Sequence, residues 1–229
     1  MKKSFLWLMT FLTVVLVSCN TSSNIEKYVD IMAKATTERF SVGEVREYKG
    51  INLDPAIGPR DNSITGIQQV DISTYTLEVT GLVENDLSYK YDEVLDYPSY
   101  ERLITLYCVE GWKATILWKG VRLMDILEEA KVKAGGEIVI FYCVDGYSTS
   151  IPLKEVMEKD MLLAYSSNGI PLTEPMGYPF IVLAEDKLGY KWARWVNKIE
   201  LSDNINYKGT WENNGYDNSA EIPNSWNEN

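Results

Sequence analysis

Residues 103–127 read LITLYCVEGWKATILWKGVRLMDIL, and this stretch decides the fold. Its first five residues, 103–107, have the alternating apolar pattern of a strand, and Cys108 stands at the end of that strand. An acidic turn with a glycine follows, then Trp112 and a second apolar run that extends to Trp118. A thiol at the corner between a strand and a loop lies where functional residues are most often placed.

The rest of the chain predicts short elements of both kinds. Lys119-Gly120 is typical of a turn, and residues 124–129 have the pattern of a short helix. The other predicted elements are strands at 75–80, 137–142, 180–184 and 195–201, a strand running into a helix at 87–95, helices at 24–40 and 152–158, and a hairpin over 161–172 around Asn168-Gly169. Strands interleaved with short helices indicate a mixed α+β fold.

Length and composition predict one globular domain. The chain has 229 residues, of which 45% are hydrophobic, and this is enough for a single sizeable core. We expect the domain to occupy residues 41–212, with a polar C-terminal tail at 213–229 whose end is mobile from Asn218 onward. Trp211 and Tyr216 indicate that the first part of the tail packs back on the domain. The formal net charge of −11 argues against nucleic acid as a partner, because nucleic acid requires basic surfaces.

The N-terminus has the pattern of an export signal. A lysine pair precedes an apolar run at residues 5–17, which is short for a membrane span. The sequence LVSC at residues 16–19 resembles a lipoprotein signal, which predicts a signal peptide at 1–18 and a lipid on Cys19. Residues 19–40 would then form a lipidated tether with a helix. An uncleaved signal anchor is the alternative, and both place the domain in the periplasm or at the cell surface, tethered to a membrane.

The pattern alone leaves three roles open for Cys108. With Cys19 lipidated, Cys108 and Cys143 are the remaining cysteines, and two thiols in an oxidising compartment favour a disulfide. A buried cysteine can also simply pack, and a thiolate can bind a soft metal. The chain has no histidine, which excludes histidine-ligated zinc or haem and histidine-based catalytic triads within it. A metal would need a thiolate and ligands from outside the chain.

The motif around Cys108 resembles that of a known family. C-V-E-G-W at 108–112, followed by W-K-G-V-R-L at 118–123, resembles the core motif of sulfite oxidase-type molybdopterin-binding domains. Three further segments resemble motifs of that family in the same order: D-G-Y-S-T-S-I-P-L at 145–153, L-L-A-Y-S-S-N-G-I-P-L at 162–172 and G-Y-K-W-A-R-W-V at 189–196. Each motif is weak alone, but four in order over roughly residues 41–201 are specific. The resemblance implies a compact, strand-rich α+β fold.

The resemblance also implies a molybdenum–molybdopterin cofactor. The family's cysteine at the position of Cys108 ligates molybdenum, and its tyrosine at the position of Tyr147 lies at the metal. A phenol there can donate a hydrogen bond to a metal oxo group or to substrate. Because the chain lacks histidine, proton transfer would fall to Tyr147, Asp145, Glu110 or water. Cys143 is interpreted as buried packing.

The phosphate of the pterin needs positive charge, which an acidic chain must gather locally. We expect Lys191 and Arg194 to bind it, because both match phosphate, and Gly189 to let the backbone approach it. Small members of the family carry a basic and amide segment over the cofactor, which corresponds here to Arg60 and Asn62. The basic residues close together near the last motif are Lys187, Lys191, Arg194 and Lys198.

Three departures from the family pattern accompany this resemblance, and the first is Lys113, which follows Trp112 where serine is common. Met176-Gly177 stands where many members have His-Gly, which puts one cofactor contact in question. The signal lacks the twin arginine that marks export in the folded state.

The implied function is that of a molybdenum-dependent oxidoreductase. It would transfer an oxygen atom to or from a small sulfur or nitrogen oxide or oxyanion. Electrons would pass to or from a separate cytochrome or quinone-linked protein, because no haem or dinucleotide motif is present in the sequence. The alternative is a non-catalytic exported binding module that keeps the fold and has a Cys108–Cys143 disulfide.

Overall fold

The computed structural model describes residues 43–56 and 62–226. The chain divides into two units, Met1–Gly43 and Glu44–Asn229, and nearly all of the described residues belong to the second. The predicted signal peptide, the predicted helix at 24–40, Cys19 and Arg60 lie outside the described residues. No helix among the described residues is long and apolar enough to cross a bilayer.

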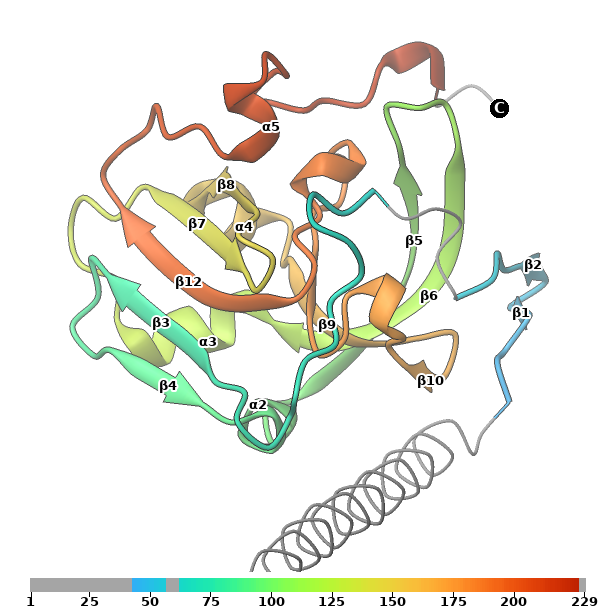
Figure 1. Cartoon of the computed structure of the whole chain (residues 1–229), viewed down its shortest axis with the longest axis horizontal. Helices are drawn as coiled ribbons and strands as arrows, with labels where there is room; N and C mark the ends of the chain where they lie inside the picture. Colours follow the sequence, from blue (N-terminus) through green and yellow to red (C-terminus); the bar gives the residue numbers. More distant parts are fainter. Residues whose placement is uncertain (1–42, 57–61, 227–229) are drawn as a thin grey trace, which may run out of the picture. The chain divides into compact units, whose positions relative to one another are not determined.

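Two five-stranded sheets form the frame of the second unit (Figure 1). The first has the strand order β4-β3-β12-β7-β8, and the second has the order β10-β9-β6-β5, with β11 also paired to β9. The strands of the first sheet are β3 (Leu77–Gly81), β4 (Leu87–Tyr89), β7 (Ile138–Cys143), β8 (Ser148–Pro152) and β12 (Val196–Ser202). Those of the second are β5 (Ser99–Tyr107), β6 (Lys113–Arg122), β9 (Leu162–Ser167), β10 (Ile170–Pro171) and β11 (Ile181–Leu183). Strand β12 runs parallel to β3, and the other pairs in both sheets are antiparallel.

Short elements connect and flank these sheets. The helices are α2 (Tyr91–Leu95), α3 (Leu123–Ala130), α4 (Leu153–Glu158) and α5 (Thr210–Asn213). The 3₁₀ turns are η1 (Glu174–Met176), η2 (Gly189–Lys191) and η3 (Asn224–Trp226), and β1 (Glu47–Tyr48) pairs with β2 (Ile51–Asn52). Pro152 directly precedes α4, because its fixed φ suits a helix start and its missing N–H is not needed there. The predicted α+β fold is confirmed.

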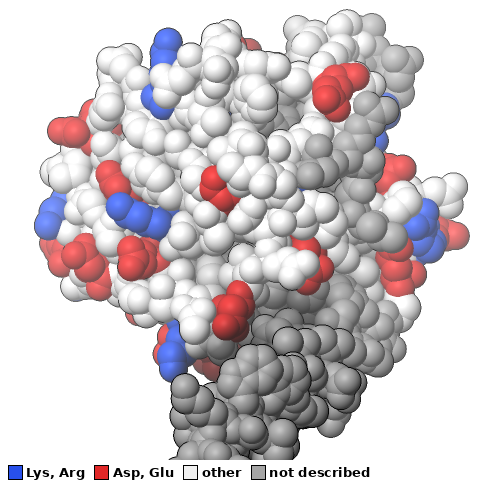
Figure 2. Space-filling view, in the orientation of Figure 1, with Lys and Arg blue, Asp and Glu red and all other residues white. Residues whose placement is uncertain are grey.

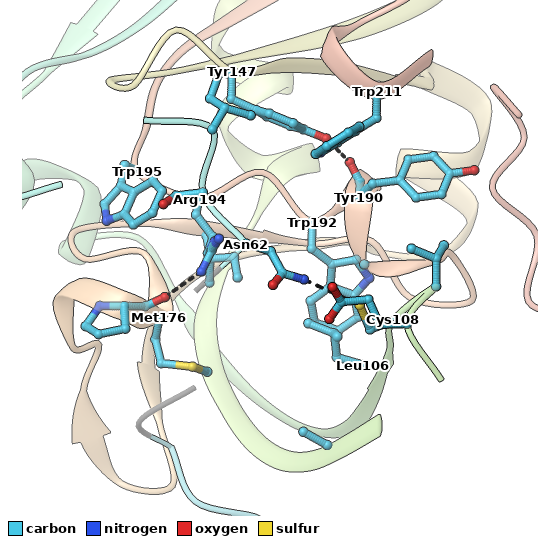
Figure 3. A pocket seen from close by; sticks show the side chains of 18 of the residues that line it. Asn62, Leu106, Cys108, Tyr147, Met176, Tyr190, Trp192, Arg194, Trp195 and Trp211 are labelled. Atoms are coloured by element: carbon cyan, nitrogen blue, oxygen red, sulfur yellow. Dashed lines mark hydrogen bonds between the residues drawn. The ribbon is translucent and has the colours of Figure 1, made fainter. Parts of the chain in front are cut away.

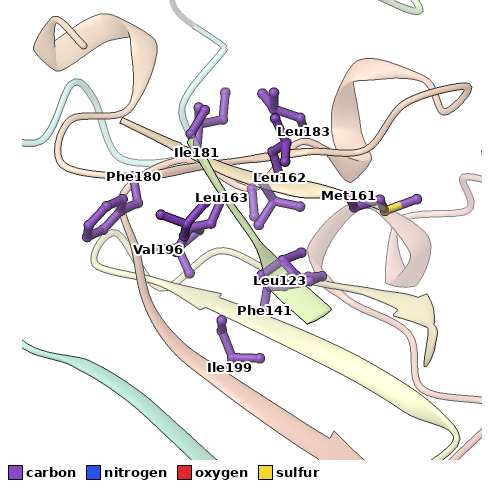
Figure 4. Close-up of a cluster of buried hydrophobic side chains, with 14 of the residues drawn as sticks. Leu123, Phe141, Met161, Leu162, Leu163, Phe180, Ile181, Leu183, Val196 and Ile199 are labelled. Atoms are coloured by element: carbon purple, nitrogen blue, oxygen red, sulfur yellow. The ribbon is translucent and has the colours of Figure 1, made fainter. Parts of the chain in front are cut away.

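One hydrophobic core joins the two sheets (Figure 4). Leu163 of β9 and Ile181 of β11 belong to the same buried cluster as Phe141 of β7 and Ile199 of β12. Burying a side chain of this size stabilises the fold by about 1.5–3 kcal/mol. Strand β7 is buried on both of its faces, which explains its nearly continuous apolar run. This core holds together the two sheets whose strand ends and loops carry the site residues.

The turn predicted at Lys119-Gly120 is wrong. Strand β6 continues through both residues to Arg122, and its pairing with β9 shifts register between Lys119 and Gly120. A Cβ added at Gly120 would lie 2.3 Å from the carbonyl oxygen of Leu163. The glycine therefore allows β6 and β9 to approach closely at a β-bulge, where the sequence pattern suggested a change of direction.

We expect Gly120→Ala to lower the free energy of unfolding. The added methyl group would meet the backbone of β9, which cannot move aside as a flexible side chain can. Overpacking of this kind costs about 1–3 kcal/mol, and each kcal/mol lowers the melting temperature by about 2–4 °C in a domain of this size. Thermal unfolding measures the effect. Gly43→Ala is the control, because an added Cβ there meets nothing within 4 Å; equal melting temperatures for the two variants would contradict this role of Gly120.

Candidate active site

The hairpin of β5 and β6 positions Cys108. The two strands pair from Ser99 opposite Val121 to Tyr107 opposite Lys113, so Cys108 begins the connecting loop. The backbone N–H of Cys108 donates to the carbonyl of Trp112 over 2.9 Å, which closes the loop. The chain at Leu188 forms a bridge with Tyr107, and this brings the turn η2 against the end of β5. Cys108 is 5% exposed.

A pocket of about 410 Å³ opens beside Cys108 (Figure 3). It lies where the β5–β6 loop, the turn before β8, η1 and the segment around η2 converge. Most of the residues predicted for the site line it: Asn62, Cys108, Asp145, Tyr147, Gly189 and Arg194. The candidate proton donor Glu110 also lines the pocket. These residues come from three of the four family motifs and from the segment that carries Asn62, so the fold brings together residues that are far apart in the sequence.

Asn62 is the residue with a described hydrogen bond to the Cys108 sulfur. Its side-chain amide nitrogen lies 3.6 Å from Sγ and donates to it. A donor at this position stabilises a thiolate more than a thiol, because hydrogen bonds favour the charged form of an acceptor. The predicted segment over the cofactor is thus represented at the pocket by Asn62.

Tyr147 and Asp145 belong to one tight turn between β7 and β8. The Asp145 carboxylate accepts the backbone N–H of Tyr147 over 3.0 Å, which fixes the turn. The Tyr147 hydroxyl donates to the carbonyl oxygen of Tyr190 (Figure 3). Burial, with a further contribution from the charge of Glu212, raises the pKa of Tyr147 well above its usual value. The phenol therefore keeps its proton at neutral pH and acts as a hydrogen-bond donor.

Arg194 is the one lysine or arginine among the described residues that line the pocket. Its guanidinium donates to the carbonyl oxygen of Pro175 over 2.7 Å and lies over the ring of Trp195, 4.7 Å from the ring centre. Gly177 lies against it, since an added Cβ would be 2.9 Å from the Cβ of Arg194. These contacts hold the guanidinium plane at the pocket wall, and its charge and planar fork suit an anion such as a phosphate.

The other basic residues predicted for the phosphate do not reach the pocket. The ammonium of Lys191 is buried and donates to the backbone carbonyl of Ser150, to Glu212 and to Asn218 over 2.9, 2.5 and 2.9 Å. Lys187 pairs with Glu155 at 2.7 Å, and Lys198 pairs with Glu200 at 2.7 Å. Three oxygens of the chain thus already hold the ammonium of Lys191, which is not among the described residues that line the pocket.

Gly189 lines the pocket, as the sequence predicts. A Cβ added there would lie 3.4 Å from a methyl carbon of Leu106 and 3.4 Å from the carbonyl oxygen of Tyr107, which is ordinary contact distance. Packing against β5 therefore does not require a glycine, and the approach of its backbone to a phosphate stays a prediction.

The two described cysteines are not bonded to each other. Cys108 lines the pocket, whereas Cys143 is buried outside it. Burial raises the pKa of Cys143 well above its usual value, and the nearby charge of Asp145 adds to this effect. Cys143 is thus a neutral packing residue, as predicted, and the disulfide alternative does not hold in this structure.

The sequence analysis predicted that Trp211 and Tyr216 pack back on the domain, but not that they line the pocket. Trp211 and Tyr216, from α5 and the segment after it, line the pocket together with Tyr190. The ring of Tyr216 contacts both others edge-on, with centroids 5.2 Å from Tyr190 and 5.4 Å from Trp211. Met176 lines it as well. The presence of large aromatic residues in an otherwise polar tail was the signal that could have placed them here.

Comparison with known proteins gives the chain its family. The family model described as "Oxidoreductase molybdopterin binding domain" matches residues 64–211. The oxidoreductase YuiH of Bacillus subtilis (strain 168) is 35% identical over 147 residues, which cover 64% of this chain and 74% of that protein. Mitochondrial sulfite oxidase of Homo sapiens is 29% identical over 180 residues, which cover 66% of this chain and 33% of that protein. The chain belongs to the oxidoreductase molybdopterin-binding domain family.

A solved structure shows the same fold. The sulfane dehydrogenase SoxCD from Paracoccus pantotrophus superposes with a TM-score of 0.58 at 24% identity, over 63% of this chain and 41% of that one. The predicted family fold is confirmed, and so is the predicted cofactor of the family, molybdenum–molybdopterin.

The pocket fits this cofactor. It presents one thiol for a soft metal, a fixed guanidinium for a phosphate, and tryptophan and tyrosine rings beside which a flat pterin can lie. Cys108 would hold the metal, and Arg194 would hold the phosphate.

Proposed function

We propose that this protein transfers an oxygen atom to or from a small sulfur or nitrogen oxide or oxyanion and exchanges electrons with a separate protein. The observation that carries the proposal is the Cys108 thiol at the wall of a pocket to which three of the four family motifs contribute. Membership of a family of oxidoreductases supports the same class of reaction.

The cofactor, when bound, supplies a centre that exchanges an oxygen atom and two electrons with the substrate. Oxidation of a substrate takes its oxygen from water and releases two protons and two electrons, and reduction of an oxide reverses this balance. Cys108 anchors the metal, and Asn62 donates to its sulfur. Tyr147 is oriented by Asp145 and stays protonated, and because its single O–H is donated to the carbonyl of Tyr190, its hydroxyl oxygen is left as an acceptor beside the pocket. Glu110, which is exposed and lines the pocket, is suited to pass protons to water.

The electron partner is expected to present a basic surface. The chain carries 33 acidic and 22 basic residues, and acidic side chains are spread over the face drawn in Figure 2. Complementary charge speeds the encounter of two proteins, and salt weakens it because the screening length falls to about 10 Å at 0.1 M. A cytochrome or quinone-linked protein with a basic face fits this requirement.

We place the domain outside the cytoplasm, tethered to a membrane by a lipid on Cys19. The N-terminal pattern of residues 1–19 supports this proposal. Mass spectrometry of the protein purified from membranes tests it: a mature chain that begins at Cys19 with attached acyl chains is expected, and an intact N-terminus would contradict it.

Dye-coupled turnover tests the reaction. Purified protein with a measured molybdenum content is assayed with sulfite and an oxidising dye, and with methionine sulfoxide, other sulfoxides and N-oxides and a reducing dye. We expect turnover with at least one substrate, no turnover without the dye, and rates proportional to molybdenum content. Fully loaded protein that turns over none of these compounds would sink the proposal.

A further inference from the structure

A buried ion pair joins η2 to α5, and each partner directly follows a residue that lines the pocket. The side chains of Lys191 and Glu212 are 2% and 0% exposed, and their charged atoms are 2.5 Å apart. Thr149 of β8 donates to the same carboxylate oxygen over 2.6 Å, while the other oxygen, Oε2, is buried without a described partner. A buried ion pair with an unsatisfied oxygen is seldom a good source of stability, because desolvation of both charges offsets their attraction. A gain in stability therefore does not explain why Lys191 and Glu212 are paired at this place in the fold.

The pair fixes one segment, residues 207–221, which we call the C-terminal strap. Asn218, near its end, accepts a hydrogen bond from Lys191 over 2.9 Å and donates to the carbonyl of Tyr207, near its start, over 3.1 Å. Glu212 lies in the middle of the strap, in α5. Lys191 thus binds the strap at two points and β8 at a third, the carbonyl of Ser150.

The strap carries part of the pocket wall. Trp211, labelled in Figure 3, immediately precedes Glu212, and Tyr216 lies between Glu212 and Asn218 in the sequence. Both tail residues line the pocket. The match of the family model ends at Trp211, so Glu212, Tyr216 and Asn218 lie beyond it. The packing continues past Asn218, where the sequence predicted a mobile end: Leu188 donates to the carbonyl of Ala220, which is 1% exposed.

We propose that Lys191 is a positioning residue, which holds the strap through Glu212 and Asn218 so that Trp211 and Tyr216 wall the pocket and retain the molybdopterin. The proposal has two halves: positioning, in which Lys191 holds the strap, and retention, in which the strap keeps the cofactor bound. The retention half rests on the proposed function, because it needs a cofactor in the pocket. The positioning half concerns the described residues alone, and each half has its own measurement.

Limited proteolysis tests the positioning. Trypsin is expected to cleave at the exposed Lys208, within the strap, about tenfold faster in Glu212→Gln and Asn218→Ala than in the wild type. Glu212→Gln replaces a charge-assisted bond to the buried ammonium by a weaker neutral one, and Asn218→Ala removes a bond to it. Asn218→Asp keeps the acceptor for Lys191 but loses the donor to the carbonyl of Tyr207, so its cleavage rate is expected to lie between those of the wild type and Asn218→Ala. Glu200→Gln removes the carboxylate from an ion pair on β12 and is the control. Should Glu212→Gln fail to fold, the two Asn218 variants decide.

Pterin release tests the retention. The cofactor lost after dilution is measured by the fluorescence of oxidised pterin in the filtrate. Release is expected to be about tenfold faster in Asn218→Ala and in Trp211→Ala, while strap cleavage rises in the first variant only. If instead Lys191 bound the cofactor directly, Lys191→Met would speed release while Glu212→Gln and Asn218→Ala would not, and the proposal would be wrong.

The outcomes also separate this inference from the proposed function. Wild-type protein that carries neither pterin nor molybdenum would count against the proposed function and the retention half, but strap cleavage would still decide the positioning half. Unchanged cleavage in both Glu212→Gln and Asn218→Ala would overturn the positioning role of Lys191. Faster cleavage with wild-type pterin release would overturn the retention half alone.

Discussion

Cys108→Ser is expected to abolish molybdenum binding and all dye-coupled turnover. The thiolate is the group that this chain offers to a soft metal at the pocket wall, and a serine hydroxyl is both harder and far less acidic. Changing a residue that merely orients a metal ligand typically costs about 10–100-fold in affinity or activity, so loss of the ligand itself should exceed about 100-fold. Elemental analysis of the purified variant gives the metal content, and the dye assay gives the rate.

Cys143→Ser is the matched control for this experiment. Cys143 is also buried, at 5% exposed, but it lies outside the pocket and is not bonded to Cys108. We expect this variant to keep most of its molybdenum, with a lower melting temperature as its main defect. Titration of the unfolded wild-type protein should find both thiols free. Equal loss of metal in the two variants, together with no free thiols, would support the Cys108–Cys143 disulfide instead. It would contradict the assignment of Cys108 as the metal ligand.

The site residues nearest to the strand ends were the ones that the sequence could predict. Cys108 follows an alternating strand, and Asp145 and Tyr147 occupy a turn between two apolar runs. Local patterns of this kind determine where a strand ends, and the end of a strand determines where its loop points. The fold and the metal-binding candidate therefore followed from short-range information and from the family motifs.

Lys191 shows what such patterns leave out. Lys187, Lys191 and Arg194 are neighbours in sequence, which suggested one basic cluster. The turn η2 and the irregular backbone after it direct these side chains to different sides of the chain. The partner of Lys191 is Glu212, and nothing local announces a pairing across 21 positions. Local patterns likewise could not place Trp211 and Tyr216 at the pocket, because their position there depends on the path of the strap.

Gly120 shows the complementary error. A glycine between polar and apolar residues is a good turn signal, but it also serves wherever two backbones must approach closely. Only the neighbouring strand distinguishes these uses, and β9 lies more than 40 positions further along the chain.

Arg194→Ala is expected to weaken binding of the cofactor by about ten- to a hundredfold. A charge-assisted contact to a phosphate contributes about 1.5–3 kcal/mol, and Arg194 is the one basic side chain among the described residues of the pocket. Pterin retained after dilution measures the loss. Lys198→Ala is the control, because Lys198 pairs with Glu200 away from the pocket and its loss should leave pterin retention unchanged.

Arg194 also supports the pocket wall through the carbonyl of Pro175, so weaker binding alone would not identify its target. Comparing intact pterin with pterin from which the phosphate has been removed separates the two effects. If Arg194 binds the phosphate, the intact form loses affinity in Arg194→Ala while the dephosphorylated form, already weak, changes little. Arg194→Lys keeps the charge without the planar fork and should fall between the wild type and the alanine variant. Equal losses for both forms of the pterin would mean that Arg194 shapes the wall, and the phosphate would then need a partner other than Arg194.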